Sequence, residues 1–168
     1  MGVDFWWIDW QQGPRAKAAG IDIMWVLNHY HMLDNSKDKT GLILSRYAET
    51  AGHRYQLGFS GDTHITWETL PYFTATASNV GYSWWSHDIG GHMDGYKNDE
   101  LYARSVQFGV FSPVNRLHSS NDDYNTKEPH VYMNGTGHIA EEFMRLRHRM
   151  IPFLHAAAMK KPLYPMLQ

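Results

Sequence analysis

The sequence predicts an α/β fold in which a parallel sheet forms part of a (β/α)8 barrel. Short apolar runs of strand length recur along the 168 residues, and each run ends in a polar residue. Segments with helical spacing lie between several of these runs, as expected for βαβ units whose strands are covered on both faces. Polar residues at or shortly after these runs, Asp9, Arg46, Asp62, Asp88 and His118, follow one another at about 27 residues on average, close to one βα unit. A (β/α)8 barrel gathers its active site at the carboxyl ends of its strands.

Five runs are expected to form strands, namely residues 5–9, 42–46, 57–62, 84–88 and 110–113. A complete barrel takes ~250 residues and eight strands. We therefore expect residues 1–168 to form one partial barrel domain, roughly strands 4 to 8 with their helices. An open sheet edge exposes unpaired backbone groups, so we also expect self-association through this edge. Only residues 47–56 separate the second run from the third, too few for a helical crossover, so that connection should be irregular.

Three helices are expected among these strands. Apolar residues at helical spacing predict one helix over Met24–Leu33. Asn98 is placed to cap another helix, which ends at Gly109. Thr66 could cap a third helix, which must begin late or kink because Pro71 would interrupt it.

A fourth helix near the end of the chain has the clearest pattern. Apolar residues recur on one helical face at Ile139, Phe143, Leu146 and Met150. Pro152 is expected to bend or end this helix. The preceding segment, residues 121–137, is rich in Asn, Asp, Thr, Pro and Gly and predicts a long surface loop.

Charge and composition exclude several classes of protein. Fifteen Lys and Arg against seventeen Asp and Glu give a net charge of -2, unlike the basic footprint of a nucleic-acid-binding protein. No apolar run has the roughly 18–20 residues of a membrane span. The absence of cysteine excludes disulfides and thiolate metal sites, and with the lack of a signal-peptide start it favours the cytoplasm. Seven Trp, ten Tyr and seven Phe suit either the stacking of sugar rings or an aromatic core.

Two carboxylates lie at the expected strand ends. Asp9 follows the apolar run Trp6–Ile8, and Asp62 follows Ser60-Gly61. Asp residues at such junctions often serve as turn formers or caps. A pair of carboxylates on either side of a glycosidic bond is also what glycoside hydrolysis requires, because one attacks or stabilises the anomeric centre and the other protonates the departing oxygen.

Several longer words in the sequence resemble glycoside hydrolase family 31, which contains α-glucosidases, α-xylosidases and α-glucan transglycosylases. The resemblance runs in order from Val3 to about Leu154, and the Trp-Ser-His-Asp-Ile-Gly-Gly segment is among its most specific parts. The words that carry it are Phe-Trp-Trp-Ile-Asp-Trp-Gln-Gln-Gly at 5–13, Ser-Arg-Tyr-Ala at 45–48, His-Arg-Tyr at 53–55, Gly-Phe-Ser-Gly-Asp-Thr at 58–63, Trp-Trp-Ser-His-Asp-Ile-Gly-Gly at 84–91 and Phe-Ser-Pro-Val-Asn-Arg-Leu-His-Ser at 111–119.

The resemblance implies roles for individual residues. Asp9 matches the family nucleophile on the fourth barrel strand and Asp62 the acid/base after the sixth, which implies a retaining double displacement on an α-linked oligosaccharide or glucoside, without a cofactor. In a retaining enzyme the two carboxyl groups stand about 5–5.5 Å apart. The resemblance assigns hydrogen bonds to the sugar to Arg46, Asp88 and His118. The aromatic residues expected to wall the sugar ring are Trp7, Trp10, Phe59 and Trp85. The family's amino-terminal β-domain and first three barrel strands would precede Met1.

Three alternatives stay open. The family also contains α-glucan glucosyltransferases, in which a sugar rather than water accepts the glycosyl group. A partial barrel could also be a catalytically inert fragment that retains sugar binding. A metal site is a third reading, because His29-Tyr30-His31 and His92-Met93-Asp94 offer two histidines and a carboxylate. Residues at i and i+2 of a helix do not share a face, however, so we expect no metal.

Overall fold

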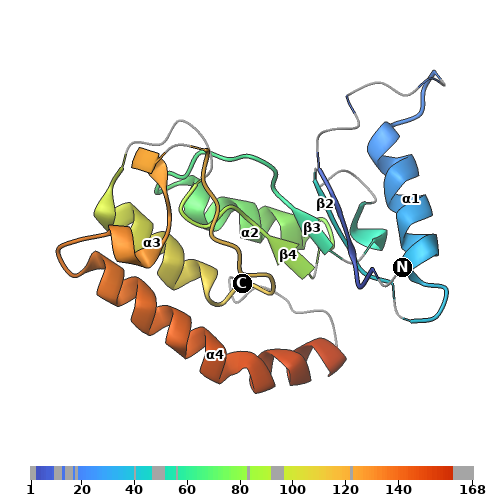
Figure 1. Cartoon of the computed structure of the whole chain (residues 1–168). Helices are drawn as coiled ribbons and strands as arrows, with labels where there is room; N and C mark the ends of the chain where they lie inside the picture. The colour runs from blue at the N-terminus through green and yellow to red at the C-terminus, as the bar shows by residue number, and fades with distance from the viewer. Residues whose placement is uncertain are drawn as a thin grey trace.

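The computed structural model describes residues 3–9, 13, 17, 19–39, 41–46, 52–55, 57–82, 84–91, 97–121 and 123–160. Their centre is a sheet of four parallel strands in sequence order (Figure 1). The strands are β1 (Trp6–Ile8), β2 (Ile43–Arg46), β3 (Leu57–Phe59) and β4 (Trp84–Ser86). The predicted partial barrel of parallel α/β type is therefore confirmed, with four of the five expected strands.

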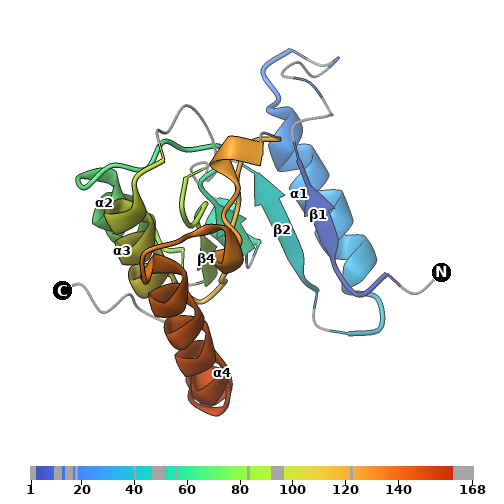
Figure 2. The ribbon, with the colours of Figure 1, turned by 60° about the vertical axis from the view of Figure 1, so that its left-hand side comes forward.

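Helices connect and cover these strands. α1 (Ile23–Asn35) joins β1 to β2, and α2 (Thr69–Asn79) joins β3 to β4. The connection from β2 to β3 contains only the short 3-10 helix η2 (Gly52–Arg54) in its described part, in agreement with the expected irregular link. α3 (Asp99–Gly109) follows β4. Figures 1 and 2 show α1 beside β1 and β2, with α2 and α3 at the other end of the sheet.

The helix starts have identifiable caps. Asp22 accepts hydrogen bonds from the backbone N–H groups of Met24 and Trp25 at the start of α1. The Asn98 side chain caps α3 as predicted, with its oxygen 2.8 Å from the backbone nitrogen of Leu101. α2 begins late, at Thr69, and this start places Pro71 in the first turn, where its missing N–H is not needed.

The strand register divides the sheet into two faces. Side chains alternate along a strand, and paired residues of neighbouring strands point to the same side. One face, which we call the site face, carries the paired residues Trp7, Leu44, Leu57 and Trp84 and, two positions further along each strand direction, Asp9, Arg46, Phe59 and Ser86. The opposite, helix face carries the paired residues Ile8, Ser45, Gly58 and Trp85.

The helix face packs against α2 through a small aromatic cluster. Trp85 and Tyr82 are buried together with Ala77 of α2. The Tyr82 ring packs directly against the backbone of Gly58, which has no Cβ. A Cβ at this position would lie 2.3 Å from the ring, which is too close for the ring to keep its place. A side chain at residue 58 would therefore separate the helix layer from the sheet.

The prediction of a fifth strand at residues 110–113 is wrong. Val110 is instead the C-cap residue of α3, and its N–H donates to the Val106 carbonyl at 3.0 Å. Its fully buried side chain packs with Ile89 and Val106. A short apolar run is consistent with a buried helix end as well as with a strand, and here the helix continues into it. After this segment the chain returns to the sheet: the Val114 N–H donates to the Trp85 carbonyl of β4 at 3.2 Å, and Ile89 and Leu117 form a parallel bridge.

The predicted surface loop at residues 121–137 is also wrong in part. Tyr132 is buried and stacks on Tyr102 of α3, with ring centroids 3.7 Å apart. The Lys127 amino group is buried as well and donates to the Asn125 carbonyl at 2.6 Å. Polar composition predicted exposure, but these groups find partners inside the fold.

The last described helix is α4 (Thr136–Lys160). It continues through Pro152, so the proline does not end it, and Figure 1 shows its axis bending in its C-terminal half. Ala140 of α4 joins the core cluster with α3. Among the described helices, none is both long and apolar enough to span a membrane.

Candidate active site

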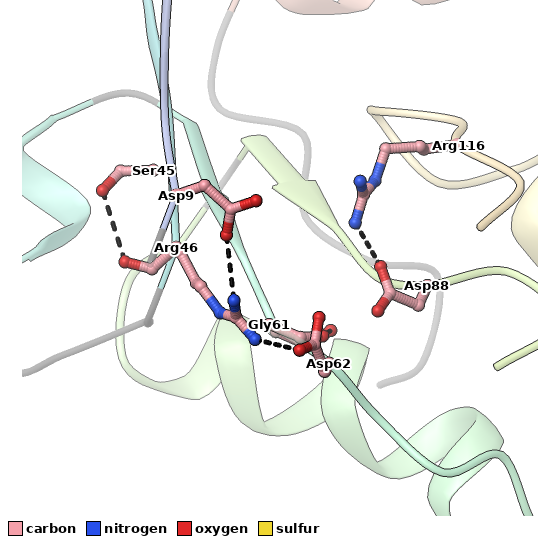
Figure 3. Close-up of polar contacts among 8 residues, drawn as sticks. Asp9, Ser45, Arg46, Gly61, Asp62, Asp88 and Arg116 are labelled. Atoms are coloured by element: carbon pink, nitrogen blue, oxygen red, sulfur yellow. Dashed lines mark hydrogen bonds and ion pairs between the residues drawn. The ribbon is translucent and has the colours of Figure 1, made fainter. Parts of the chain in front are cut away.

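Three charged side chains meet at the carboxyl ends of β1, β2 and β3. Arg46 is the last residue of β2, Asp9 follows β1 directly, and Asp62 follows β3 by three residues. The Arg46 Nη1 atom lies 2.9 Å from Asp9 Oδ1, and its Nη2 atom forms an ion pair with Asp62 Oδ2 (Figure 3). One guanidinium therefore holds both predicted catalytic carboxylates, one on each nitrogen.

Local geometry explains why these residues converge. Parallel strands bring their carboxyl ends to the same edge of the sheet, so residues 37 positions apart in the sequence become neighbours. Gly61 has a φ of 76°, a left-handed conformation that suits glycine and turns the chain after β3 toward Arg46. The Arg46 side chain is 8% exposed, whereas Asp9 and Asp62 are 31% and 26% exposed. The carboxylates thus remain accessible while the guanidinium beneath them is fixed.

The charges of the two carboxylates act on Arg46. Burial by itself would lower the pKa of the guanidinium, because it disfavours the charged form. The hydrogen bonds and charges of Asp62 and Asp9 outweigh burial and raise the pKa of Arg46 above its ordinary value. Arg46 is therefore a permanent positive charge between two carboxylates.

A second arginine–carboxylate pair lies at the end of β4. Asp88, whose side chain is fully buried, forms an ion pair with Arg116 Nη2. Figure 3 shows this pair beside the Asp9–Arg46–Asp62 group. His118 completes the cluster, since one ligand-type atom each from Asp62, Asp88 and His118 lies within 4.8 Å of the other two. The structure thus brings together Asp9, Arg46, Asp62, Asp88 and His118, all five polar residues predicted for the site.

The aromatic residues predicted to wall the sugar ring differ in their face of the sheet and in their exposure. Trp7 is on the site face and 51% exposed. Phe59 is on the same face but buried, at 2% exposure. The prediction for Trp85 is wrong. Strand alternation places its side chain on the helix face, packed against Tyr82, so it does not wall this site. Trp10 lies outside the described residues.

Metal coordination has limited support in the described part of the chain. Asp62, Asp88 and His118 could together hold a divalent cation, but Arg46 and Arg116 already place positive charges on the two carboxylates. The alternative histidines have other contacts: His31 Nδ1 hydrogen-bonds the Leu27 carbonyl at 2.8 Å. His29 contacts Tyr55, with 3.4 Å between its Nδ1 and the phenolic oxygen. His92 and Asp94 lie outside the described residues.

Arg116 is a site residue that the sequence reasoning did not single out. It lies within the Phe111–Ser119 word, two residues before His118. Residues at i and i+2 of an extended segment point to the same side, so this spacing was the available signal. Its partner, Asp88, could not be inferred from the spacing.

A partial parallel barrel with paired carboxylates at its strand ends is a glycosidase-like arrangement, and comparison with known proteins identifies the family. Residues 1–157 match the model of the glycosyl hydrolases family 31 TIM-barrel domain. The chain belongs to this family, as a part of its TIM-barrel domain. This membership and the four parallel strands agree with the resemblance drawn from the sequence words.

Individual relatives carry different activities in their names. An α-xylosidase of Emericella nidulans is 27% identical over 176 residues, which is 95% of this chain and 22% of the relative. A 1,6-α-glucosyltransferase of Sporosarcina globispora is 32% identical over 83 residues, 46% of this chain and 6% of the relative. The chain therefore spans less than a quarter of the length of these curated relatives.

A solved structure shows the same fold. The crystal structure of a family 31 α-glucosidase from Bacteroides thetaiotaomicron superposes with a TM-score of 0.72 and 23% sequence identity. The match covers 92% of this chain and 28% of that protein. The four described strands and their helices are therefore arranged as in a larger family 31 barrel.

Proposed function

We propose that this chain supplies the two catalytic carboxylates of a retaining glycosidase that acts on α-linked glucosides. One observation carries the proposal: Arg46 holds Asp9 and Asp62 on the two nitrogens of a single guanidinium, at the strand ends where barrel enzymes place their catalytic groups. Membership of family 31 supports this reading. Retention of configuration requires two carboxyl groups close to one anomeric carbon.

In the first half-reaction, an Asp9 carboxylate oxygen forms a bond to the anomeric carbon as the bond to the leaving-group oxygen breaks. The electron pair of the broken bond stays on the departing oxygen, which takes a proton from Asp62. Arg46 orients Asp9 for attack through its 2.9 Å hydrogen bond. The product is a glycosyl ester on Asp9.

In the second half-reaction, a water molecule attacks the anomeric carbon and the ester bond to Asp9 breaks. Asp62, now a carboxylate, accepts the proton of the attacking water. Esterification removes the negative charge from Asp9, so the charge of Arg46 is then balanced by Asp62 alone.

Sugar recognition is proposed for the other polar side chains of the cluster. His118 lies close to Asp62 and can hydrogen-bond the hydroxyl groups of a sugar whose anomeric carbon lies between Asp9 and Asp62, while the fully buried Asp88 beside it positions the groups around the sugar. Exposed Trp7 offers an apolar face to the ring. Such hydrogen bonds contribute to rate when they strengthen in the distorted transition state.

Covalent labelling tests the catalytic assignment directly. A deactivated fluoroglucosyl fluoride should form a stable ester on Asp9, detected by mass spectrometry of the Asp9 peptide. Asp9→Asn should take up no label, whereas Asp62→Asn should still be labelled, because fluoride leaves without protonation. A label on any other residue, or equal labelling of Asp9→Asn, would reject the assignment.

Glucosyl transfer is a second candidate, favoured by the similarity to the 1,6-α-glucosyltransferase. Both reactions share the ester on Asp9 and differ only in the group that attacks it. Supplying maltose with an aryl α-glucoside separates them, because transfer yields longer sugars and hydrolysis yields glucose. A catalytically inert chain that retains sugar binding would saturate with glucose but yield neither product nor label.

A further inference from the structure

Arg116 holds a position in the site that the catalytic scheme does not use. Its Nη2 atom pairs with Asp88 Oδ1, and the Asp88 side chain is fully buried while that of Arg116 is 17% exposed. A buried carboxylate is costly unless a cation and hydrogen bonds compensate it. Arg116 supplies this compensation where the polar cluster meets the end of β4.

The guanidinium of Arg116 also touches two aromatic rings from other strands. Its central carbon lies 5.3 Å from the centroid of Trp7, on β1, and 4.9 Å from the centroid of Phe59, on β3. These distances are within the range of cation–π attraction. Arg116 therefore contacts groups on β1, on β3 and after β4 at once.

Backbone hydrogen bonds hold the segment that carries Arg116. The Val114 N–H donates to the Trp85 carbonyl at 3.2 Å, and the Ile89 N–H donates to the Arg116 carbonyl at 3.2 Å. The His118 N–H donates to the Ile89 carbonyl at 3.3 Å. The segment thus runs alongside β4 and the residues that follow it, and these backbone hydrogen bonds fix the positions of both Arg116 and His118.

We infer that Arg116 is a positioning residue for sugar recognition: it holds the Asp88 carboxylate and the Trp7 ring in the arrangement that binds the sugar. This inference rests on the proposed function of the site. The described contacts of its guanidinium are with Asp88 and the two rings, so the side chain acts through them. Arginine suits this role because its planar guanidinium can pair with a carboxylate at its edge and stack on rings with its face, which a lysine ammonium cannot do equally well.

The test measures KM and kcat for an aryl α-glucoside in the intact protein carrying Arg116→Gln, Arg116→Lys, Asp88→Asn and the Arg116→Gln/Asp88→Asn pair. We expect Arg116→Gln to raise KM about tenfold or more with a smaller change in kcat. Arg116→Lys should recover part of the loss. The double variant should have a KM close to that of Asp88→Asn alone, because both changes remove one shared interaction.

A matched control distinguishes this role from a general effect of removing an arginine ion pair. Arg145 pairs with Glu141 on the exposed surface of α4 at 2.5 Å, and Arg145→Gln should leave KM unchanged. A lower melting temperature of Arg116→Gln with unchanged KM would overturn the inference, because Arg116 would then be structural only. Additive effects in the double variant would also overturn it, because Arg116 would then act without Asp88.

Failure of the proposed function is detected separately. If the fluoroglucosyl fluoride does not label Asp9 in the unaltered protein, catalysis by Asp9 is rejected whatever Arg116 does. Calorimetric titration of the same variants with glucose then replaces KM. Weaker binding by Arg116→Gln, without further loss in the double variant, supports the positioning role, and equal binding by all variants overturns it.

Discussion

The segment Ser86-His87-Asp88 presents two opposite environments on successive residues. Asp88 belongs to the site face, where its buried charge is paired with Arg116. His87 belongs to the helix face, is 4% exposed, and neither of its ring nitrogens has a hydrogen-bond partner among the described residues. It packs near Phe108 of α3, with ring centroids 5.7 Å apart.

The two faces therefore manage ionisable side chains differently. On the site face, Asp9, Asp62 and Asp88 are each paired with a guanidinium. On the helix face, burial lowers the pKa of His87 to about 4, which keeps the imidazole neutral at physiological pH. The charged side chains therefore lie at the strand ends of the site face, whereas His87, which faces the helices, is kept neutral by burial.

The largest effect is expected from a neutral substitution on the site face. Asp9→Asn keeps the shape of the side chain but removes the proposed nucleophile, so kcat for an aryl α-glucoside should fall by about 10³-fold or more. The matched control is Asp4→Asn, which changes a carboxylate upstream of β1 and should leave kcat unaltered. If Asp9→Asn kept more than a tenth of the activity, Asp9 would not be the nucleophile, and the site face would not differ from the helix face in a catalytic role.

A smaller loss is expected when the shared cation is removed. Arg46→Met leaves Asp9 and Asp62 repelling each other without their common partner, so kcat/KM should fall by about 10²-fold. Arg46→Lys should recover little, because one ammonium does not present the two-nitrogen fork that both carboxylates use. Activity close to that of the unaltered protein in both variants would show that the carboxylates do not depend on Arg46.

His87 predicts a pH dependence on the helix face. Its pKa is about 4 in the folded protein and near 6.5 when unfolded, so the unfolded state binds more protons between these values. Stability from this group is fully present above pH 6.5 and is lost as pH falls toward 4, by about 2 kcal/mol between pH 6.5 and 5. Urea unfolding across this range measures the slope. His87→Leu should reduce it, and an identical slope in the variant would show that His87 is not the group responsible.

The smallest effect concerns packing alone. Gly58→Ala forces a Cβ against the buried Tyr82 ring and should lower the free energy of unfolding by about 2 kcal/mol, with kcat unchanged in the folded protein. In a Tyr82→Leu background the added cost of the Gly58 change should shrink, because the flat ring is no longer there. Equal costs in both backgrounds would place the strain elsewhere.

Prediction from the sequence was accurate where a local pattern determines the element. Four apolar runs form the parallel strands, and the Asn98 cap starts α3 as expected. It was inaccurate for residues 110–113 and 121–137, where the outcome depends on what packs above the segment. Val110 and Tyr132 are buried by α3 and α4, which a local pattern does not reveal.

The same division applies to the site. The strand-end positions of Asp9, Arg46, Asp62 and Asp88 were readable from the chain, and the structure brings them together with His118, which lies next to the Ile89–Leu117 bridge. The assignment of Trp85 to the ring wall was wrong because it ignored the strand register, which turns that side chain toward α2. Arg116 was missed because its partner lies 28 residues away.

The sequence by itself determined the family, the order of the strands and the kinds of side chain at their ends, because these depend on local composition and on recognisable words. Only the tertiary structure decided that one guanidinium holds Asp9 and Asp62 and that Arg116 joins Asp88 to two rings. Such pairings are made between strands, across a sheet edge, and their geometry comes from register and burial rather than from neighbouring residues in the chain.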